Sequence, residues 1–363
     1  MIYITGLSIS LFIAALLLKK KKKSRSDFIL LGWILFIAIH LYFFYINFTG
    51  DIYKTPHLLG IHFPLPLFHG IFLYYYVLSV THQFSKQKKL LLVHLIPIIV
   101  AYIYLSSFFM LSGQEKIAVF ENKGKGYEMF LSVGLVLIYI SGIVYMIFSS
   151  ILLKKYKKNI HSQFSDIEEI DLSWLQFLIY GLGLIWGILI ISNKDEYIFI
   201  GLSVFVILIG FFGIQQKNIF KKEYTVYKQQ QKTNESKKKK YEKSGLTDDL
   251  ANSSYILLMQ LMKKEKCYKE NDLSLNSLAT KLEIHPNYLS EIINRKEEKS
   301  FYDFINDFRI EEFKTLLKNS KNQNYTLLSL AYECGFNSKS SFNRCFKKST
   351  GKTPTQYLKS HRL

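Results

Sequence analysis

The chain has 363 residues, of which 49% are hydrophobic and 16% aromatic, and its formal net charge is +19. So much apolar surface excludes a disordered chain. The apolar residues are concentrated before residue 215 and the rest is polar and basic, which excludes a single soluble globule. The three cysteines (Cys267, Cys334 and Cys345) all lie in the polar part, so no secreted disulfide scaffold is indicated.

Residues 1–214 contain seven long apolar segments. An α-helix needs about 20 residues to cross a bilayer, so the sequence predicts a seven-helix transmembrane bundle in this part of the chain. The predicted spans are 2–18, 28–48, 61–80, 90–111, 129–153, 172–192 and 197–214.

The charges of the connecting loops predict the orientation of this bundle. The first, third and fifth loops together hold 13 Lys and Arg residues, and the other three hold 5. Basic loops stay on the cytoplasmic side. We therefore expect a multi-pass protein of the cytoplasmic (inner) membrane, with its N-terminus outside and its C-terminal half in the cytoplasm.

Two histidines, His40 and His69, lie deep in the predicted spans. Ionisable side chains at membrane depth are candidates for function, so both are candidate sensing residues, although a merely structural role competes. One enzyme-like spacing, His161 with Asp166, is not accompanied by a phosphate-binding motif. We therefore expect no catalytic residue, no metal site and no cofactor.

A basic linker is predicted over residues 215–245. Residues 215–243 include ten Lys and three Glu. A lysine cluster beside a membrane is attracted to anionic lipid by about 1 kcal/mol per charge, and it is also suited to DNA phosphates. The alternative is a solvated, extended tether.

The remaining residues, 246–363, contain an internal repeat with an offset of 52 or 53 residues. Each copy has a short helix with apolar positions i, i+3, i+4 and i+7, a turn, and a second amphipathic helix. This is the helix-turn-helix pattern, whose second helix enters the major groove of DNA. The sequence predicts helix-turn-helix units at 274–296 and 326–348, joined by a connecting helix at 301–318, with a leading helix at 247–262. The whole chain is thus predicted to be all-α.

The second unit and the residues after it carry a longer motif. It reads Gly335-Phe336-x-Ser338-x-Ser340-x-Phe342-x-Arg344-x-Phe346-Lys347, then Gly351-x-Thr353-Pro354-x-x-Tyr357. This motif resembles the signature of the AraC/XylS family of bacterial transcription regulators, and the resemblance extends over about residues 273–358.

The resemblance implies an all-helical domain that binds double-stranded DNA sequence-specifically and regulates transcription. RNA polymerase and a second copy of the chain are further candidate partners. With a membrane bundle in place of the usual sensing domain, the chain resembles membrane-bound members of the family in Bacteroidetes-like bacteria. It departs from the pattern at Glu283, where Gly is common, and at Phe313, where Ala is usual. Both departures affect the expected spacing of the two units.

The predicted DNA-contacting residues are those left over once the apolar positions are assigned to the core. In the first unit they are Asn287, Ser290, Glu291 and Asn294, with His285 and Tyr288 flanking; in the second they are Lys339, Ser340, Asn343, Arg344 and Lys347. Arg, Asn and Glu suit guanine, adenine and cytosine edges respectively. Ser338 and Lys348 are predicted to contact phosphate. The alternative for Arg344 is an ion pair with a nearby acid.

The charge of the two units is unequal. Residues 272–320 hold 7 basic and 9 acidic side chains, whereas residues 321–363 hold 8 and 1. The second unit should therefore supply most of the attraction to phosphates. Cys334 and Cys345 fall on apolar helix faces, which favours buried core residues over redox sensors.

The sequence as a whole predicts a membrane-embedded, one-component transcription regulator in which a signal in the bundle alters DNA binding. The alternative is a seven-helix receptor or transporter with the DNA-binding domain as a secondary readout. Transporters tend to contain inverted repeats, and the seven spans show no convincing repeat. A third class, an intramembrane enzyme, would need a paired catalytic constellation that the sequence lacks.

Overall fold

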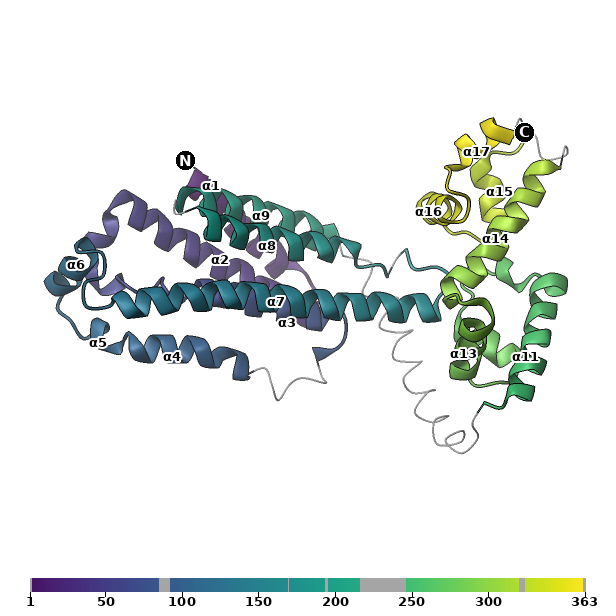
Figure 1. Ribbon diagram of the computed structural model, residues 1–363. Coiled ribbons are helices and arrows are strands. Elements are labelled where there is room, and N and C mark those ends of the chain that lie inside the picture. The colour runs from purple at the N-terminus through teal and green to yellow at the C-terminus, as the bar shows by residue number, and fades with distance from the viewer. Residues whose placement is uncertain are drawn as a thin grey trace. The chain divides into compact units, whose positions relative to one another are not determined.

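The computed structural model describes residues 2–84, 92–168, 170–192, 195–215, 246–319 and 324–361 (Figure 1). These residues are almost entirely helical, which confirms the all-α prediction, and within them there is no β-strand. Two compact units are present: Met1–Lys155 with Leu172–Gln216, and Tyr156–Asp171 with Lys217–Leu363. Nearly all of the predicted basic linker, 215–245, lies outside the described residues.

The first unit is built from nine described helices and two short 3₁₀ turns. The helices are α1 (Ile2–Lys19), α2 (Arg25–Thr49), α3 (Pro66–Val80), α4 (Ile96–Tyr104), α5 (Ser106–Phe109), α6 (Gly113–Glu121), α7 (Glu128–Gln163), α8 (Ser173–Ile191) and α9 (Asp195–Gln215); the 3₁₀ turns are η1 (Asp51–Lys54) and η2 (Pro56–Leu58). The last two turns of α7 belong to the second unit.

Three helices in the described ranges, α2, α7 and α8, are long and apolar enough to cross a membrane. The other four predicted spans correspond to shorter apolar helical stretches at α1, α3, α4 and α9, which are Ile4–Lys19, Pro66–Val80, Leu92–Tyr104 and Glu196–Gly210. By helix length and composition, the described residues therefore support three of the seven predicted membrane spans.

Prolines account for much of the difference in the third and fourth predicted spans. Pro66 lies in the first turn of α3, so the helix begins there and not at residue 61. Pro97 lies in the first turn of α4. A proline has no backbone N–H and fits the first turn of a helix far better than its interior. The predicted span 61–80 is therefore helical in α3 only from Pro66, and the span 90–111, whose first two residues lie outside the described ranges, is divided between α4 and α5.

Helices α7 and α8 pack closely through a glycine. A Cβ atom built on Gly142 of α7 would lie 2.1 Å from Nε1 of Trp186 on α8, so no larger side chain fits there. The Trp186 Nε1–H donates a hydrogen bond to the carbonyl oxygen of Ile138 at 3.0 Å. Indole N–H groups in an apolar setting need such a partner, and this contact fixes the tryptophan against α7.

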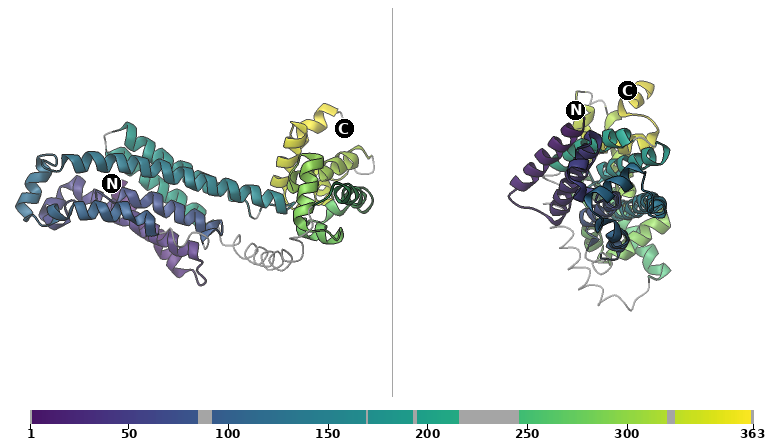
Figure 2. Two further views of the ribbon diagram at one scale, coloured as in Figure 1. Left: turned by 60° about the horizontal axis from the view of Figure 1, so that its bottom comes forward. Right: turned by 90° about the vertical axis from the view of Figure 1, so that its left-hand side faces the viewer.

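The second unit forms a compact helical body, coloured green to yellow in Figure 2. Its helices are α11 (Asp248–Gln260), α12 (Leu275–Lys281), α13 (Pro286–Glu297), α14 (Phe301–Lys318), α15 (Leu327–Glu333), α16 (Lys339–Thr350) and α17 (Pro354–His361). A π-helical turn (Leu261–Glu265) and a 3₁₀ turn (Cys267–Lys269) follow α11. Helix α14 contacts α13, α15 and α16, so it joins the α12–α13 and α15–α16 pairs.

Caps fix the ends of the helix-turn-helix segments. The Ser274 Oγ accepts a hydrogen bond from the Ser277 N–H at 3.1 Å and thereby caps α12. The Ser338 Oγ accepts one from the Ser341 N–H at 3.1 Å and caps α16. A cap of this kind typically stabilises a helix by about 1 kcal/mol.

The turns of the two helix-turn-helix segments both contain a left-handed residue, but they differ in the room available for a side chain. Glu283 adopts φ 55° and the equivalent Gly335 adopts φ 97°. The first turn therefore keeps the left-handed conformation despite its glutamate, at a cost of about 1–2 kcal/mol. A Cβ atom on Gly335 would lie 2.8 Å from the carbonyl oxygens of both Tyr268 and Lys269, so the second turn requires glycine for two independent reasons.

The larger Phe313 is accommodated within an aromatic cluster. Its ring centroid lies 4.7 Å from that of Phe342 and 5.5 Å from that of Phe346. All three side chains are buried. Packing of these rings holds α14 against α16 and positions the polar face of α16.

We predict that Gly335→Ala destabilises the second unit by at least about 2 kcal/mol, because a left-handed alanine is strained and its Cβ meets two carbonyl oxygens. The three cysteines are buried and all lie in this unit, so thiol labelling of the intact chain reports its opening. Labelling should accelerate about thirtyfold, at a factor of ten per 1.4 kcal/mol.

The matched control is Glu283→Ala, which changes the equivalent turn residue without adding a Cβ atom. Its labelling rate should stay within about threefold of the wild-type rate. Equal rates for wild type and Gly335→Ala would show that the second turn tolerates a side chain.

Candidate functional site

Helix α16 presents a polar face above a buried apolar one. Phe342, Cys345 and Phe346 are buried. The predicted DNA-contacting residues Lys339, Ser340, Arg344 and Lys347 are exposed, and Asn343 is half-buried. The amphipathic spacing and the Ser338 cap therefore bring the predicted residues of the second helix-turn-helix onto one accessible helix, α16.

Helix α13 has the same division. Leu289, Ile292 and Ile293 are buried. Of the predicted residues, Asn287 and Asn294 are exposed, whereas Tyr288, Ser290 and Glu291 are half-buried. Glu291 pairs with Arg295 on the next turn at 2.5 Å, so its carboxylate is neutralised within its own helix.

His285 differs from its predicted place beside the groove. Its side chain is only 7% exposed. Its Nδ1 accepts a hydrogen bond from the Asn287 N–H at 3.1 Å, so the imidazole caps the N-terminus of α13. We therefore interpret His285 as a capping residue and not as a base-reading one.

The basic side chains of α16 have different surroundings. Lys348 pairs with Asp303 of α14 at 2.6 Å. Within the described part of the chain, Lys339 and Lys347 form no ion pair. Lys339 and Lys347 are therefore readily available to phosphates, whereas Lys348 must first break its ion pair with Asp303.

Arg344 is engaged on both sides of its guanidinium. Its Nη1 lies 3.4 Å from Oδ2 of Asp171. Its Nη2 donates to the Tyr302 hydroxyl at 3.2 Å, and the group lies 5.9 Å from the Tyr302 ring centroid. The pairing of Arg344 with an acid, which the sequence left open as an alternative, is thus present in this structure.

Asp171 belongs to a segment that sequence reasoning did not connect with DNA binding. Residues 164–171, here called the acidic loop, lie between α7 and α8 and form part of the second unit. Ser340 donates a hydrogen bond to Glu168, and Asn337 Nδ2 donates to Asp166 Oδ2 at 2.5 Å. The available signal was four acids within residues 166–171 of a loop predicted to be cytoplasmic.

A buried polar cluster underlies the acidic loop. Arg309 of α14 is 1% exposed, and burial lowers the pKa of its guanidinium to about 10. It remains charged at neutral pH. Its Nε donates to the Tyr268 carbonyl at 2.7 Å, and its Nη2 donates to the Glu270 carbonyl at 2.8 Å. Buried charges require such partners.

The cysteines of this unit are structural. Burial raises the pKa of the Cys334 thiol to about 12, and burial also raises that of Cys345. A thiol, unlike a thiolate, is a poor nucleophile. These environments favour the core interpretation over a redox sensor.

The first unit contains a buried chain of hydrogen bonds through the two candidate sensing residues. The Trp33 Nε1–H donates to His69 Nδ1 at 3.3 Å, and His69 Nε2 lies 2.7 Å from His40 Nδ1. If both rings are neutral, the tryptophan fixes the His69 proton on Nε2, which donates to His40. The His40 proton then lies on Nε2, a buried atom with no partner among the described residues.

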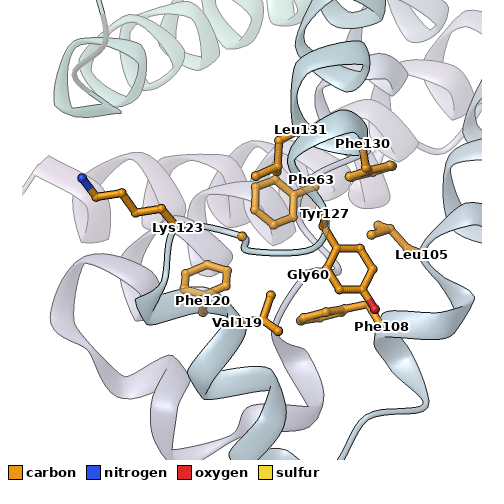
Figure 3. A pocket seen from close by; sticks show the side chains of 11 residues that line it. Gly60, Phe63, Leu105, Phe108, Val119, Phe120, Lys123, Tyr127, Phe130 and Leu131 are labelled. Carbon is orange, nitrogen blue, oxygen red and sulfur yellow. The ribbon is translucent and has the colours of Figure 1, made fainter.

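An apolar cavity of about 250 Å³ lies elsewhere in the first unit (Figure 3). Aromatic side chains dominate its lining: Phe63, Phe108, Phe120, Tyr127 and Phe130. In Figure 3 the side chain of Lys123 extends away from these rings. Among the residues that the structure describes, no group of three or more His, Cys, Asp or Glu side chains is arranged to hold a metal ion.

Comparison with known proteins places the C-terminal segment in a class. A family model described as a helix-turn-helix domain matches residues 278–360. An uncharacterized HTH-type transcriptional regulator of Escherichia coli (strain K12), YijO, is 33% identical over 89 residues, which are 24% of this chain and 30% of YijO. A second, YobQ of Bacillus subtilis (strain 168), is 39% identical over 85 residues, or 23% of this chain and 34% of YobQ.

A third similar protein is an HTH-type transcriptional regulator in the cgkA 5′ region of Pseudoalteromonas carrageenovora. It is 29% identical over 133 residues, 36% of this chain and 72% of that protein. A solved structure of a protein of unknown function from Listeria innocua is 26% identical and covers 29% of this chain and 94% of its own, with a TM-score of 0.25. A score this low establishes no shared fold.

These matches and the α12–α16 geometry define the class. The chain carries a helix-turn-helix domain of the DNA-binding kind found in transcriptional regulators. The matching segments span only about a third of YijO and of YobQ, so the similarity concerns this domain.

We predict that Arg344→Ala and Lys347→Ala weaken DNA binding in different ways. Loss of a bidentate arginine contact to guanine should remove about 1–3 kcal/mol of discrimination at one base pair. Loss of Lys347 should weaken binding to all sequences alike and lower the salt slope by about one. The measurement is binding of the intact chain to a library of single-base-pair variants at two salt concentrations.

The change of preference is the diagnostic quantity, because Arg344→Ala also removes a contact to the acidic loop. If Arg344→Ala leaves every base preference intact, Arg344 does not read a base. The assignment of the α16 face would then be wrong.

Proposed function

We propose that the protein is a membrane-embedded, one-component transcription regulator of the AraC/XylS type. The observation that carries the proposal is the presence of long apolar helices and a helix-turn-helix domain in one polypeptide. In this proposal residues 1–214 form a seven-helix bundle in the cytoplasmic membrane. The domain from residue 246 binds double-stranded DNA in the cytoplasm.

The DNA-binding function rests on the two polar helix faces. Exposed Lys339, Ser340, Arg344 and Lys347 on α16 would supply phosphate and base contacts. Asn287 and Asn294 on α13 would read a second, neighbouring stretch of the groove. Because residues 321–363 hold 8 basic and 1 acidic side chains, whereas residues 272–320 hold 7 and 9, α16 and its surroundings would dominate affinity, while α13 would mainly contribute preference.

The sensing function rests on the His40–His69 pair. A ring nitrogen buried without a hydrogen-bond partner is costly, and among the residues that the structure describes His40 Nε2 has none. In the neutral pair it is a donor, so it suits a ligand that brings a hydrogen-bond acceptor into the bundle. The proposed regulator would therefore respond to a small molecule with an apolar body and one such acceptor.

Membrane orientation tests this function directly. A reporter that is active only in the cytoplasm should be active when fused after Lys243 and silent when fused after Lys54. The physical reason is the excess of basic residues in the odd-numbered loops. The reverse pattern would place the helix-turn-helix domain outside the cell and contradict regulation by DNA binding.

A further inference from the structure

The second compact unit has an internal binding site that is occupied by the acidic loop of the same chain. Phe164 forms an isolated antiparallel bridge with Ser274. The backbone N–H and the hydroxyl of Ser165 both donate to the Leu273 carbonyl, at 3.3 and 2.6 Å. Ser165 and Ile167 are each 1% exposed. The loop is therefore built into the unit at these positions and does not merely rest on its surface.

Buried polar side chains of α14 line this binding site and donate hydrogen bonds to the loop. Asn306 Nδ2 donates to the Ser165 carbonyl at 3.0 Å. Arg309 Nη1 donates to the same carbonyl at 3.4 Å, and its Nη2 donates to the Ser165 hydroxyl at 3.3 Å. Asn306 and Arg309 are buried. Buried donors without partners cost free energy, so the acidic loop stabilises the unit by supplying acceptors to Asn306 and Arg309.

The acids of the loop extend from this anchor to the α15–α16 turn and to α16. Asp166 accepts from Asn337 in the turn, Glu168 accepts from Ser340, and Asp171 pairs with Arg344. Three successive polar groups of the second helix-turn-helix unit are therefore occupied by three carboxyl groups. The acids also place negative charge beside the basic side chains of α16.

We propose that the acidic loop is an intramolecular competitor of DNA. The proposal rests on the proposed function, because it takes the polar face of α16 as the DNA-reading face. A carboxylate and a phosphate oxygen accept the same charge-assisted hydrogen bonds, so Arg344 and Ser340 cannot serve both at once. DNA binding by the second unit therefore requires the acids to leave.

The competitor is held in a way that permits release. The anchor at Ser165 is buried, whereas at the acidic end the Arg344 side chain is 46% exposed and that of Asp171 is 17% exposed. Exposed ion pairs are individually weak, so DNA or a small movement of the loop displaces them. The loop joins α7 to α8, and these helices are closely packed at Gly142 and Trp186. A rearrangement of this helix pair would thus be transmitted to the acids through the chain itself.

The first test neutralises the three acids in the intact chain, held in nanodiscs of uncharged lipid. Asp166→Asn, Glu168→Gln and Asp171→Asn together should tighten binding of a random-sequence duplex library about tenfold. The charge-matched control combines Asp249→Asn, Glu298→Gln and Glu311→Gln, exposed acids elsewhere in the second unit. The control should tighten binding less than threefold, and equal gains in the two triple variants would overturn the competitor.

The second test locks the loop reversibly. Asp166→Cys and Asn337→Cys replace two side chains whose polar atoms lie 2.5 Å apart, and the native cysteines are buried. Oxidation should join them and weaken binding of the same duplex library at least tenfold, and reduction should restore it. Failure of the disulfide to form, or unchanged affinity in the oxidised protein, would contradict the proposal.

The two tests separate this inference from the proposed function. If the wild-type chain, the neutralised variant and the reduced double-cysteine variant all fail to bind duplex DNA, the proposed function is wrong and the competitor falls with it. If all bind with one affinity, the regulator remains and only the competitor is excluded.

Discussion

The second unit depends on the buried guanidinium of Arg309. A charge removed from water must find hydrogen-bond acceptors in the protein, and removing one partner of such a group costs several kcal/mol. Arg309 meets this constraint with carbonyls of the segment before α12, with Asn306 on its own helix, and with Ser165 of the acidic loop. It also lies 5.7 Å from the ring centroid of Phe336, in the turn of the second helix-turn-helix unit. One side chain thus links the acidic loop to both helix-turn-helix pairs of the second compact unit.

This constraint explains why the acidic loop is held strongly at Ser165 and weakly at Glu168 and Asp171. At Ser165 the loop supplies acceptors to buried donors, and those contacts are costly to break. At Glu168 and Asp171 it meets exposed groups, where each contact contributes about 1 kcal/mol or less. Couplings of about 1–3 kcal/mol change an affinity between about fivefold and 150-fold. Weak acidic contacts on a strong anchor are therefore matched to regulation, because they alter binding without unfolding the domain.

The parts of the fold that sequence predicted best depend on local physics. Apolar periodicity predicted the pairs of amphipathic helices, because their buried positions recur at helical spacing within each segment. Gly335 adopts the left-handed conformation, which glycine takes without a steric penalty. Glu283 adopts that conformation too, because the tertiary fold outweighs about 1–2 kcal/mol of local strain.

The parts that sequence missed depend on contacts between distant residues. Ser165 meets Arg309 across 144 positions, and Arg344 meets Asp171 across 173. Such pairs leave no periodic signal in either segment. The capping role of His285 was missed for another reason: this role usually falls to Ser, Thr, Asp or Asn, so the residue was predicted to flank the groove. Hydropathy alone set the predicted spans at α3 and α4, and it does not register where a proline begins a helix.

In the proposed regulator, one chain connects the membrane to specific DNA. The most direct measurement is to crosslink cells that express the intact chain, wash the membrane fraction, and sequence the DNA recovered with the protein. The account predicts a small set of discrete genomic sites that share a sequence motif and are recovered from membranes. Recovery of DNA without any preferred site, or of the protein only from the soluble fraction, would contradict it.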